Sequence, residues 1–157
     1  MNIAAIVKNL GPSQCNFFLT KEFNKISEKQ SNSCTVFVND PTIPVVDPSF
    51  SCPVVAFLPH FKGVCISTDI YTTEQMLQTC GIIDKFFYIW DLEWTSNIMN
   101  YNHAVNIMRD ENLQLIARSE SHAKIISNFC NKEVCGIVDN WESSELLQIT
   151  GNINVNK

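Results

Sequence analysis

Residues 113–138 read LQLIARSESHAKIISNFCNKEVCGIV: a short apolar run, a polar turn, a helical pattern and a second apolar run. Ser119 stands where it can cap the helix, and the apolar stripe of that helix runs from Ile125 to Phe129. A strand, a helix and a strand in this order form a βαβ unit, in which the two strands are parallel. This stretch therefore predicts an α/β fold.

The same alternation extends over the rest of the chain. Apolar runs predict strands at residues 3–7, 35–38, 54–58, 63–67, 86–90, 113–117 and 134–138. Amphipathic patterns predict helices at about 15–29, 72–80, 99–110, 119–129 and 142–149, the second of them capped by Thr72 or Thr73. We expect a single Rossmann-like, doubly wound α/β domain over residues 1–150, with a mostly parallel sheet and helices on both faces. A frayed polar tail is expected at residues 151–157.

The composition is that of a folded chain without the charge of a nucleic-acid-binding protein. Hydrophobic residues make up 45% of the sequence and charged residues 17%, and the net charge is −5. Because phosphate contacts need clustered lysine and arginine, nucleic acid is an improbable partner for the chain on its own. No apolar stretch approaches the length of a membrane span, and no basic segment precedes the first apolar run, so we expect neither a membrane partner nor a signal peptide.

The seven cysteines are scattered and lie mostly inside apolar runs. Their odd number and the lack of a Cys-x-x-Cys pair predict reduced thiols, no disulfide and no metal site. We therefore expect a cytoplasmic protein in which titration of the denatured chain finds all seven thiols free.

The cofactor-binding loops of familiar α/β enzymes are absent from the sequence. The loop after the first predicted strand, residues 9–14, contains only Gly11, and no G-x-G-x-x-G, Walker A or G-x-S-x-G motif occurs. We therefore expect no cofactor. The loop remains a candidate ligand contact through Gly11 and Ser13, although a single glycine is a weak signal.

The main candidate for chemistry is the apolar strand KFFYIWDLEW at residues 85–94, which ends in acid. In an open parallel sheet, ligands bind just beyond the carboxyl ends of the strands. Asp91 and Glu93 are therefore candidate general bases. A solvated loop that contains a helix cap explains the same two carboxylates equally well.

Two histidines and a serine are further candidates. His60 follows the predicted strand at residues 54–58 and is a candidate for the same cleft, although a plain loop histidine is the more common case. Ser119 and His122 lie in the first turn of a predicted helix, where an anion can bind. A simple capped helix with a partly buried histidine also explains both residues.

Nearly the whole chain resembles a known enzyme family in its pattern, and two parts carry the motifs. The final strand, RSES turn, helix and strand, followed by Asp139-Asn140-Trp141, resemble the end of the N-terminal domain of GT-B glycosyltransferases. Residues 85–92 are similar to one branch, the phage-type DNA β-glucosyltransferases, in which a lysine-led aromatic strand ends in an aspartate followed by an apolar residue. The resemblance implies that Asp91 is the catalytic base that deprotonates an acceptor hydroxyl, with Glu93 in reserve.

The resemblance also implies a need for a partner. GT-B enzymes bind the nucleotide sugar mainly with a C-terminal domain, so a GT-B C-terminal-like subunit would supply the donor site. The acceptor would be contacted by Gly11, Ser13, His60, Ser119 and His122. The acidic composition departs from that expected of a DNA-modifying enzyme.

Two alternatives stay open at this point. The first is a non-catalytic binding module that holds a protein or small ligand through the aromatic residues Trp90, Trp94, Tyr101 and Trp141. The second is a small α/β enzyme that acts directly on a nucleotide or a sugar. The missing glycine-rich loop counts against the second alternative.

Overall fold

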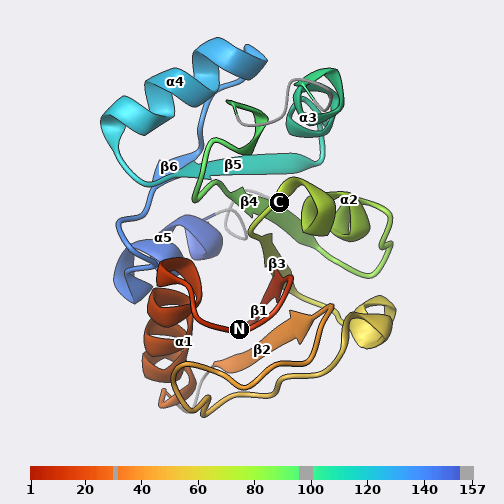
Figure 1. Ribbon diagram of the computed structural model, residues 1–157, viewed down its shortest axis with the longest axis vertical. Coiled ribbons are helices and arrows are strands. Elements are labelled where there is room, and N and C mark those ends of the chain that lie inside the picture. The colour runs from red at the N-terminus through yellow and green to blue at the C-terminus, as the bar shows by residue number, and fades with distance from the viewer. Residues whose placement is uncertain (30–31, 96–100, 153–157) are drawn as a thin grey trace.

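The computed structural model describes residues 1–29, 32–95 and 101–152, and its strands form one parallel sheet (Figure 1). The strands are β1 (Asn2–Val7), β2 (Ser33–Val38), β3 (Val64–Ser67), β4 (Asp84–Tyr88), β5 (Leu113–Ala117) and β6 (Gly136–Ile137). Their order across the sheet is β2-β1-β3-β4-β5-β6, and each neighbouring pair is parallel. The predicted Rossmann-like α/β fold is confirmed.

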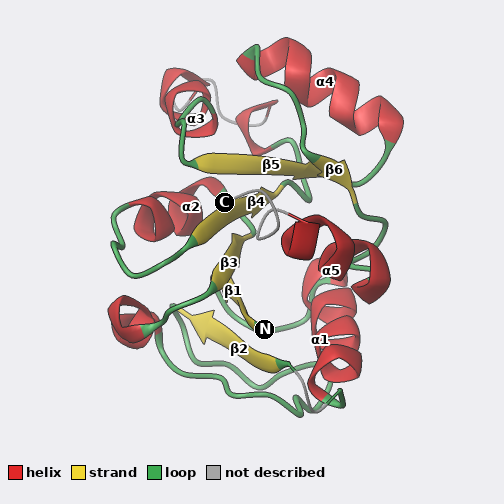
Figure 2. Ribbon diagram, turned by 180° about the vertical axis from the view of Figure 1, so that it is seen from behind, coloured by secondary structure: helices red, strands yellow, loops and turns green. Residues whose placement is uncertain are grey.

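Helices cover both faces of this sheet (Figure 2). One face carries α1 (Gln14–Ser27) and α5 (Ser143–Asn152), and the other carries α2 (Ile70–Leu77), α3 (Tyr101–Met108) and α4 (Glu120–Cys130). Neighbouring residues of a strand point to opposite faces, so Ala5 and Val7 of β1 join the first core and Ala4 and Ile6 the second. The sheet is therefore buried on both sides, as a parallel sheet requires.

The predicted strand at residues 54–58 is wrong. Val55–His60 form a short 3-10 helix, η1, which contains Pro59. The apolar run lies between Pro53 and Pro59. Because proline lacks a backbone N–H, the run cannot continue a regular ladder of hydrogen bonds. Leu58 of this run is buried in the core, but Phe57 is 58% exposed, so the run is not covered on both faces as the strands of the sheet are.

A strand-like contact nevertheless forms just before this run. Ser51 and Val54 make parallel bridges with Thr35 and Val38 on the outer edge of β2. We call residues 51–54 the edge segment. Counted third along the chain, the edge segment gives the spatial order 3-2-1-4-5-6-7, whose first six positions follow the Rossmann order.

Three other boundaries differ from the expected ones. The ladder of β4 ends at Tyr88, two residues earlier than predicted, and β6 pairs over only Gly136–Ile137. Asp69 rather than a threonine caps α2, because its Oδ1 accepts the N–H of Thr72 at 2.7 Å.

The predicted cap of the fourth helix is confirmed. Ser119 caps α4, and its Oγ accepts the N–H of His122 at 3.2 Å. The predicted start of the third helix, residues 99 and 100, lies outside the described residues. Of the tail predicted at 151–157, Gly151 and Asn152 belong to α5, and residues 153–157 lie outside the described residues.

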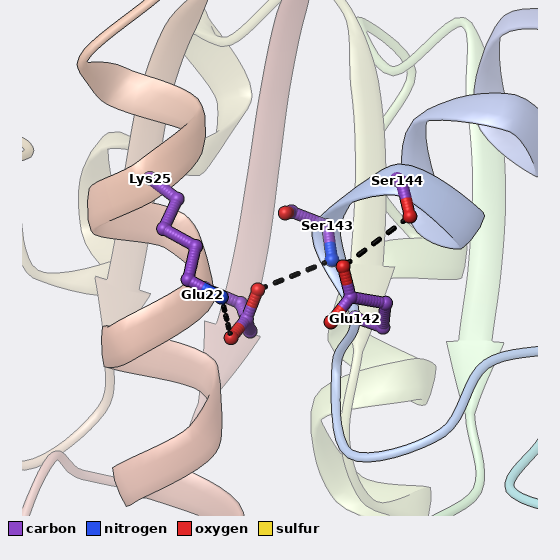
Figure 3. Close-up of polar contacts among 5 residues, drawn as sticks. All are labelled: Glu22, Lys25, Glu142, Ser143 and Ser144. Carbon is purple, nitrogen blue, oxygen red and sulfur yellow. Dashed lines mark hydrogen bonds and ion pairs between the residues drawn. The ribbon is translucent and has the colours of Figure 1, made fainter.

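Glu22 is a buried carboxylate that joins α1 to α5 (Figure 3). Its Oε2 accepts the backbone N–H of Ser143 at 3.3 Å, and its Oε1 accepts a hydrogen bond from Lys25 Nζ at 2.6 Å. The first N–H groups of a helix have no partner within that helix, so α1 supplies one for α5. This contact fixes α5 on the sheet next to the last strand.

We expect Glu22→Ala to lower the free energy of unfolding by about 1–3 kcal/mol, because the buried N–H of Ser143 then loses its acceptor. Lys25→Ala is the matched control and should change stability little, since the Lys25 side chain is 47% exposed. Urea denaturation of both variants measures the difference. Equal losses would assign the effect to the ion pair rather than to the helix contact.

The structure also bears on thiols and on membrane spans. All seven cysteines are present as free thiols. Over the described ranges, the chain has no helix that combines the length and the apolar character of a membrane span.

Candidate functional site

The order of the strands reverses next to β1. The chain passes from β1 to β2 on one side, and β3 then pairs with β1 on the other side. At such a switch point the loops that follow the strands separate, and ligands of open α/β sheets bind in the crevice between them. We therefore expect a ligand-binding site at the carboxyl edge of the sheet, around β1, β3 and β4.

Two adjoining pockets lie along this edge. The switch-point pocket, of about 280 Å³, is lined among others by Lys8, Ser13, Cys15, Asp69, Asp91 and Glu93. The Arg118 pocket, of about 340 Å³, is lined among others by Trp90, Asp91, Arg118, Ser119, His122 and Asp139. Asp91 lines both pockets and is exposed to solvent, so its carboxylate is available to a ligand in either.

The loop after β1 forms one wall of the switch-point pocket. Ser13 lines this pocket, but its Oγ accepts the N–H of Asn16 at 3.0 Å and so caps α1. Gly11 lies behind the lining: its N–H donates to Asn9 Oδ1 at 2.9 Å, and its carbonyl accepts a hydrogen bond from Asn16 Nδ2 at 2.8 Å. Gly11 thus shapes the loop, and Ser13 faces the pocket.

Glu93 is a half-buried carboxyl on the other wall. Its Oε2 accepts the N–H of Ile70, the first residue of α2, at 3.4 Å. Burial raises the pKa of Glu93 to about 7, the Asp69 and Asp91 carboxylates add to the rise, and the Ile70 N–H opposes it. A carboxyl with a pKa near neutrality can both take and return a proton, as general acid–base catalysis requires.

We expect Glu93→Gln to stabilise the fold by roughly 1–2 kcal/mol at about pH 8, after allowance for solvent screening. The raised pKa means that the folded chain favours the protonated carboxyl, so wild-type stability falls as the pH rises from 4.5 to about 7. Glutamine stays neutral and keeps an acceptor for the Ile70 N–H. Urea denaturation at about pH 4 should show no difference between the two proteins.

Glu28→Gln, which alters an exposed carboxylate at the end of α1, is the control for this comparison. A Glu93→Gln protein less stable than the wild type at about pH 8 would contradict the prediction. It would mean that the ionised carboxylate holds the start of α2.

Arg118 links the chain segments that follow β4, β5 and β6. Its Cζ lies 3.8 Å from the centroid of the Trp90 ring, in a cation–π contact. Its Nη1 donates to the Trp90 carbonyl at 3.5 Å and its Nη2 to Asn140 Oδ1 at 3.3 Å. The guanidinium therefore fixes the backbone next to Asp91. The sequence shows only that Arg118 follows a predicted strand, and it does not indicate this role.

Ser119 and His122 line the Arg118 pocket together, and both also serve the fold. Ser119 caps α4, and His122 Nδ1 accepts the N–H of Arg118 at 3.3 Å. The neutral ring therefore carries its proton on Nε2. Burial lowers the pKa of His122, the Arg118 charge lowers it further, and Asp91 opposes both. His122 thus acts at neutral pH as a donor without charge.

The expected place of His60 in this cleft is wrong, because His60 lies at the opposite edge of the sheet. It ends η1, and the next residues contact the amino-terminal ends of strands: the Lys62 carbonyl accepts a hydrogen bond from Asn2 Nδ2 at 3.3 Å. The Phe61 carbonyl oxygen lies 2.9 Å from where a Cβ on Gly81 would stand, just before β4. A strand over residues 54–58 would have been needed to carry His60 to the carboxyl edge.

The three tryptophans named as possible binding anchors are core residues. Their exposed fractions are 8% for Trp90, 6% for Trp94 and 0% for Trp141. Trp141 packs edge-on against Tyr88, with 4.5 Å between ring centroids. Of the four aromatic anchors considered, only Tyr101, at 45%, is exposed.

Cys15 is the one cysteine in the lining of the two pockets, at the start of α1. Burial raises the pKa of its thiol to about 12, so it stays protonated and is a poor nucleophile. Within the described residues, histidine, cysteine and carboxylate side chains form no group of three that could hold a metal ion.

Two acidic residues of this edge were not named as site residues from the sequence: Asp139, which lines the Arg118 pocket, and Asp69. Asp69 lies after β3, lines the switch-point pocket and caps α2. The spacing Asp69-x-x-Thr72 is a capping-box pattern and was the available signal.

Comparisons with protein-family models, curated proteins and solved structures find no match to this chain.

Proposed function

We propose that this domain is the acceptor-side half of a GT-B-like glycosyltransferase, which transfers a sugar from a nucleotide sugar to a hydroxyl acceptor. The position of Asp91 carries the proposal: it is exposed between two pockets at the carboxyl edge of the sheet. Ligands of open α/β sheets bind at this edge, and a carboxylate there can reach the hydroxyl of a bound acceptor.

In the proposed reaction Asp91 takes the proton of the acceptor hydroxyl. The hydroxyl oxygen attacks the anomeric carbon of the sugar on the face opposite the nucleotide, and a new carbon–oxygen bond forms. The bond from the anomeric carbon to the phosphate oxygen breaks, and its electron pair leaves with the nucleotide. Glu93, on the wall of the switch-point pocket, is the reserve base.

A partner subunit that resembles a GT-B C-terminal domain would hold the nucleotide sugar. The loop after β1 has one glycine, Gly11, whose N–H is already bonded to Asn9, so this loop offers no glycine-lined seat for a diphosphate. The seven free thiols support a reducing, cytoplasmic compartment for the complex. By the same resemblance, we propose that the chain comes from a phage.

Affinity capture from the native host, followed by mass spectrometry, tests this proposal. Recovery of a subunit with a nucleotide-sugar domain, together with transfer of labelled sugar that needs both chains, would support it. Transfer should be lost with Asp91→Asn and kept with Asp47→Asn, a matched change at an exposed carboxylate outside both pockets. Capture of an unrelated protein without sugar transfer would contradict it.

The alternative of a non-catalytic binding module is favoured by exposed apolar side chains beside the switch-point pocket. Ile43 is 89% exposed and Val45 49%, and the Val45 N–H donates to the carbonyl of Leu10 in the loop after β1. Phe17, in the first turns of α1, is 40% exposed. The same capture experiment would then recover a partner whose binding is weakened by Ile43→Ser and unaffected by Asp91→Asn.

A further inference from the structure

We infer that the Arg118 pocket binds an uncharged polyhydroxyl ligand, the chemical class of a monosaccharide. The inference rests on the proposed function and names the acceptor class of its site. It predicts that the acceptor is sugar-like and uncharged, and not a phosphorylated compound or a nucleic acid.

The hydrogen-bonding groups of the pocket are both donors and acceptors. The Arg118 guanidinium and the His122 Nε2–H donate, and the Asp91 and Asp139 carboxylates accept. A hydroxyl group can donate and accept at once, whereas a phosphate oxygen only accepts and an ammonium only donates. A ligand with several hydroxyls is therefore the class that satisfies the whole set.

The charges of the lining disfavour an anion. In the Arg118 pocket one cation, Arg118, faces two carboxylates, Asp91 and Asp139. The adjoining switch-point pocket adds Lys8, but it also adds Asp69 and Glu93. Carboxylates thus outnumber cations along the edge even when Glu93 is protonated, so a phosphate or a nucleic-acid strand would meet net negative potential.

Arg118 retains hydrogen-bonding capacity for a ligand. Its Nε is buried, so the donors available to a ligand are those of the two Nη groups, whose hydrogen bonds to Trp90 and Asn140 are long at 3.5 and 3.3 Å. The cation–π contact with the Trp90 ring helps to hold the guanidinium at the pocket wall. A donor that is already positioned loses little side-chain entropy when it binds a ligand oxygen.

The size of the pocket agrees with one sugar ring. Its volume of about 340 Å³ is at the lower end of the range for small-molecule sites. A nucleic-acid strand needs a long, basic groove. The Arg118 pocket does not provide one, because its charged lining consists of Asp91, Asp139 and a single arginine.

Ligand titration of the isotope-labelled chain, followed by NMR at the Trp90 indole and the His122 ring, tests the inference. The probes are D-glucose, D-galactose, N-acetylglucosamine and myo-inositol, with glucose 6-phosphate and a short DNA duplex as anionic competitors. We expect at least one neutral probe to give saturable shifts at both residues, with glucose 6-phosphate and DNA binding more weakly.

Two pocket variants and one control complete the test. Asp139→Asn and Arg118→Lys should each weaken the neutral probe by about tenfold, because each alters a charged hydrogen-bonding partner. Asp47→Asn, at an exposed carboxylate outside the pocket, should leave the affinity unchanged. No saturable shift with any neutral probe, or tighter binding of glucose 6-phosphate or DNA, would overturn the inference.

The outcome is separable from that of the proposed function. Binding is measured on this chain alone, whereas sugar transfer needs the partner subunit. Polyol binding without any transfer would reject only the enzyme, and transfer to a phosphorylated or nucleic-acid acceptor would reject only the acceptor class.

Discussion

Asp91→Asn should lower the turnover of sugar transfer by about 100- to 10,000-fold, the usual contribution of a general base. Asparagine keeps the shape of the side chain and removes the carboxylate that accepts the proton. The fold should survive, because Asp91 is exposed and lies beyond the end of β4. Steady-state kinetics with the reconstituted partner measure the loss, and thermal melting checks that the variant is folded.

Glu93→Gln separates the two candidate bases. If Asp91 is the base, this second variant should keep most of its turnover. If Glu93 is the base, its substitution should cause the larger loss, and wild-type turnover should rise with pH through about 7, where this carboxyl ionises. Full activity of the Asp91→Asn protein would remove Asp91 as the base, and a large loss of thermal stability would make it a structural cap.

Trp141→Ala should lower the free energy of unfolding by about 3–5 kcal/mol, the usual cost of truncating a buried tryptophan. The Trp141 side chain is fully buried and packs edge-on against Tyr88 and Phe23. The Tyr88 hydroxyl donates to the Val138 carbonyl at 2.8 Å, so the cavity would open beside a buried hydrogen bond. Urea denaturation measures the loss.

The backbone at this position gives the alanine variant no relief. Asn140 and Trp141 have φ values of 45° and 65°, in the left-handed region, which asparagine tolerates but which is unfavourable for a bulky residue such as tryptophan and for alanine. The ring packing therefore holds a strained turn between β6 and α5. Phe57→Ala, at a 58% exposed side chain, is the control and should cost less than about 1 kcal/mol. A stable Trp141→Ala protein that had lost a binding partner would restore the anchor role of this residue.

The fold class could be predicted because its signal is local. Residues 3–7 are apolar throughout and residues 113–117 are apolar except for the half-buried Gln114, as expected of strands covered on both faces, and amphipathic helices separate such runs. The run at 54–58 has the same composition but did not form a strand. Pairing depends on hydrogen bonds from a distant neighbour, and Pro53 and Pro59 limit that pairing in a way that composition alone does not show.

The site could be predicted only in part, since it is assembled from several strands. The end of one strand placed Asp91 and Glu93 at the carboxyl edge. Asp69 and Arg118 come from the ends of β3 and β5, and their approach to Asp91 depends on the order of strands in the sheet. That order is set by how crossovers pack, and no short stretch of sequence contains it.

The edge segment beside β2 also affects how copies of this domain meet one another. An uncovered strand edge is a template for pairing with another molecule, and pairing of this kind leads to aggregation. Here the N–H groups of Val36 and Val38 already donate to the carbonyls of Ser51 and Pro53. The segment therefore satisfies these two donors of β2, and Pro53, which has no N–H, interrupts the ladder within the segment. The Val36 and Val38 donors of β2, which could otherwise recruit a strand of a neighbouring copy, are thus occupied within the chain itself.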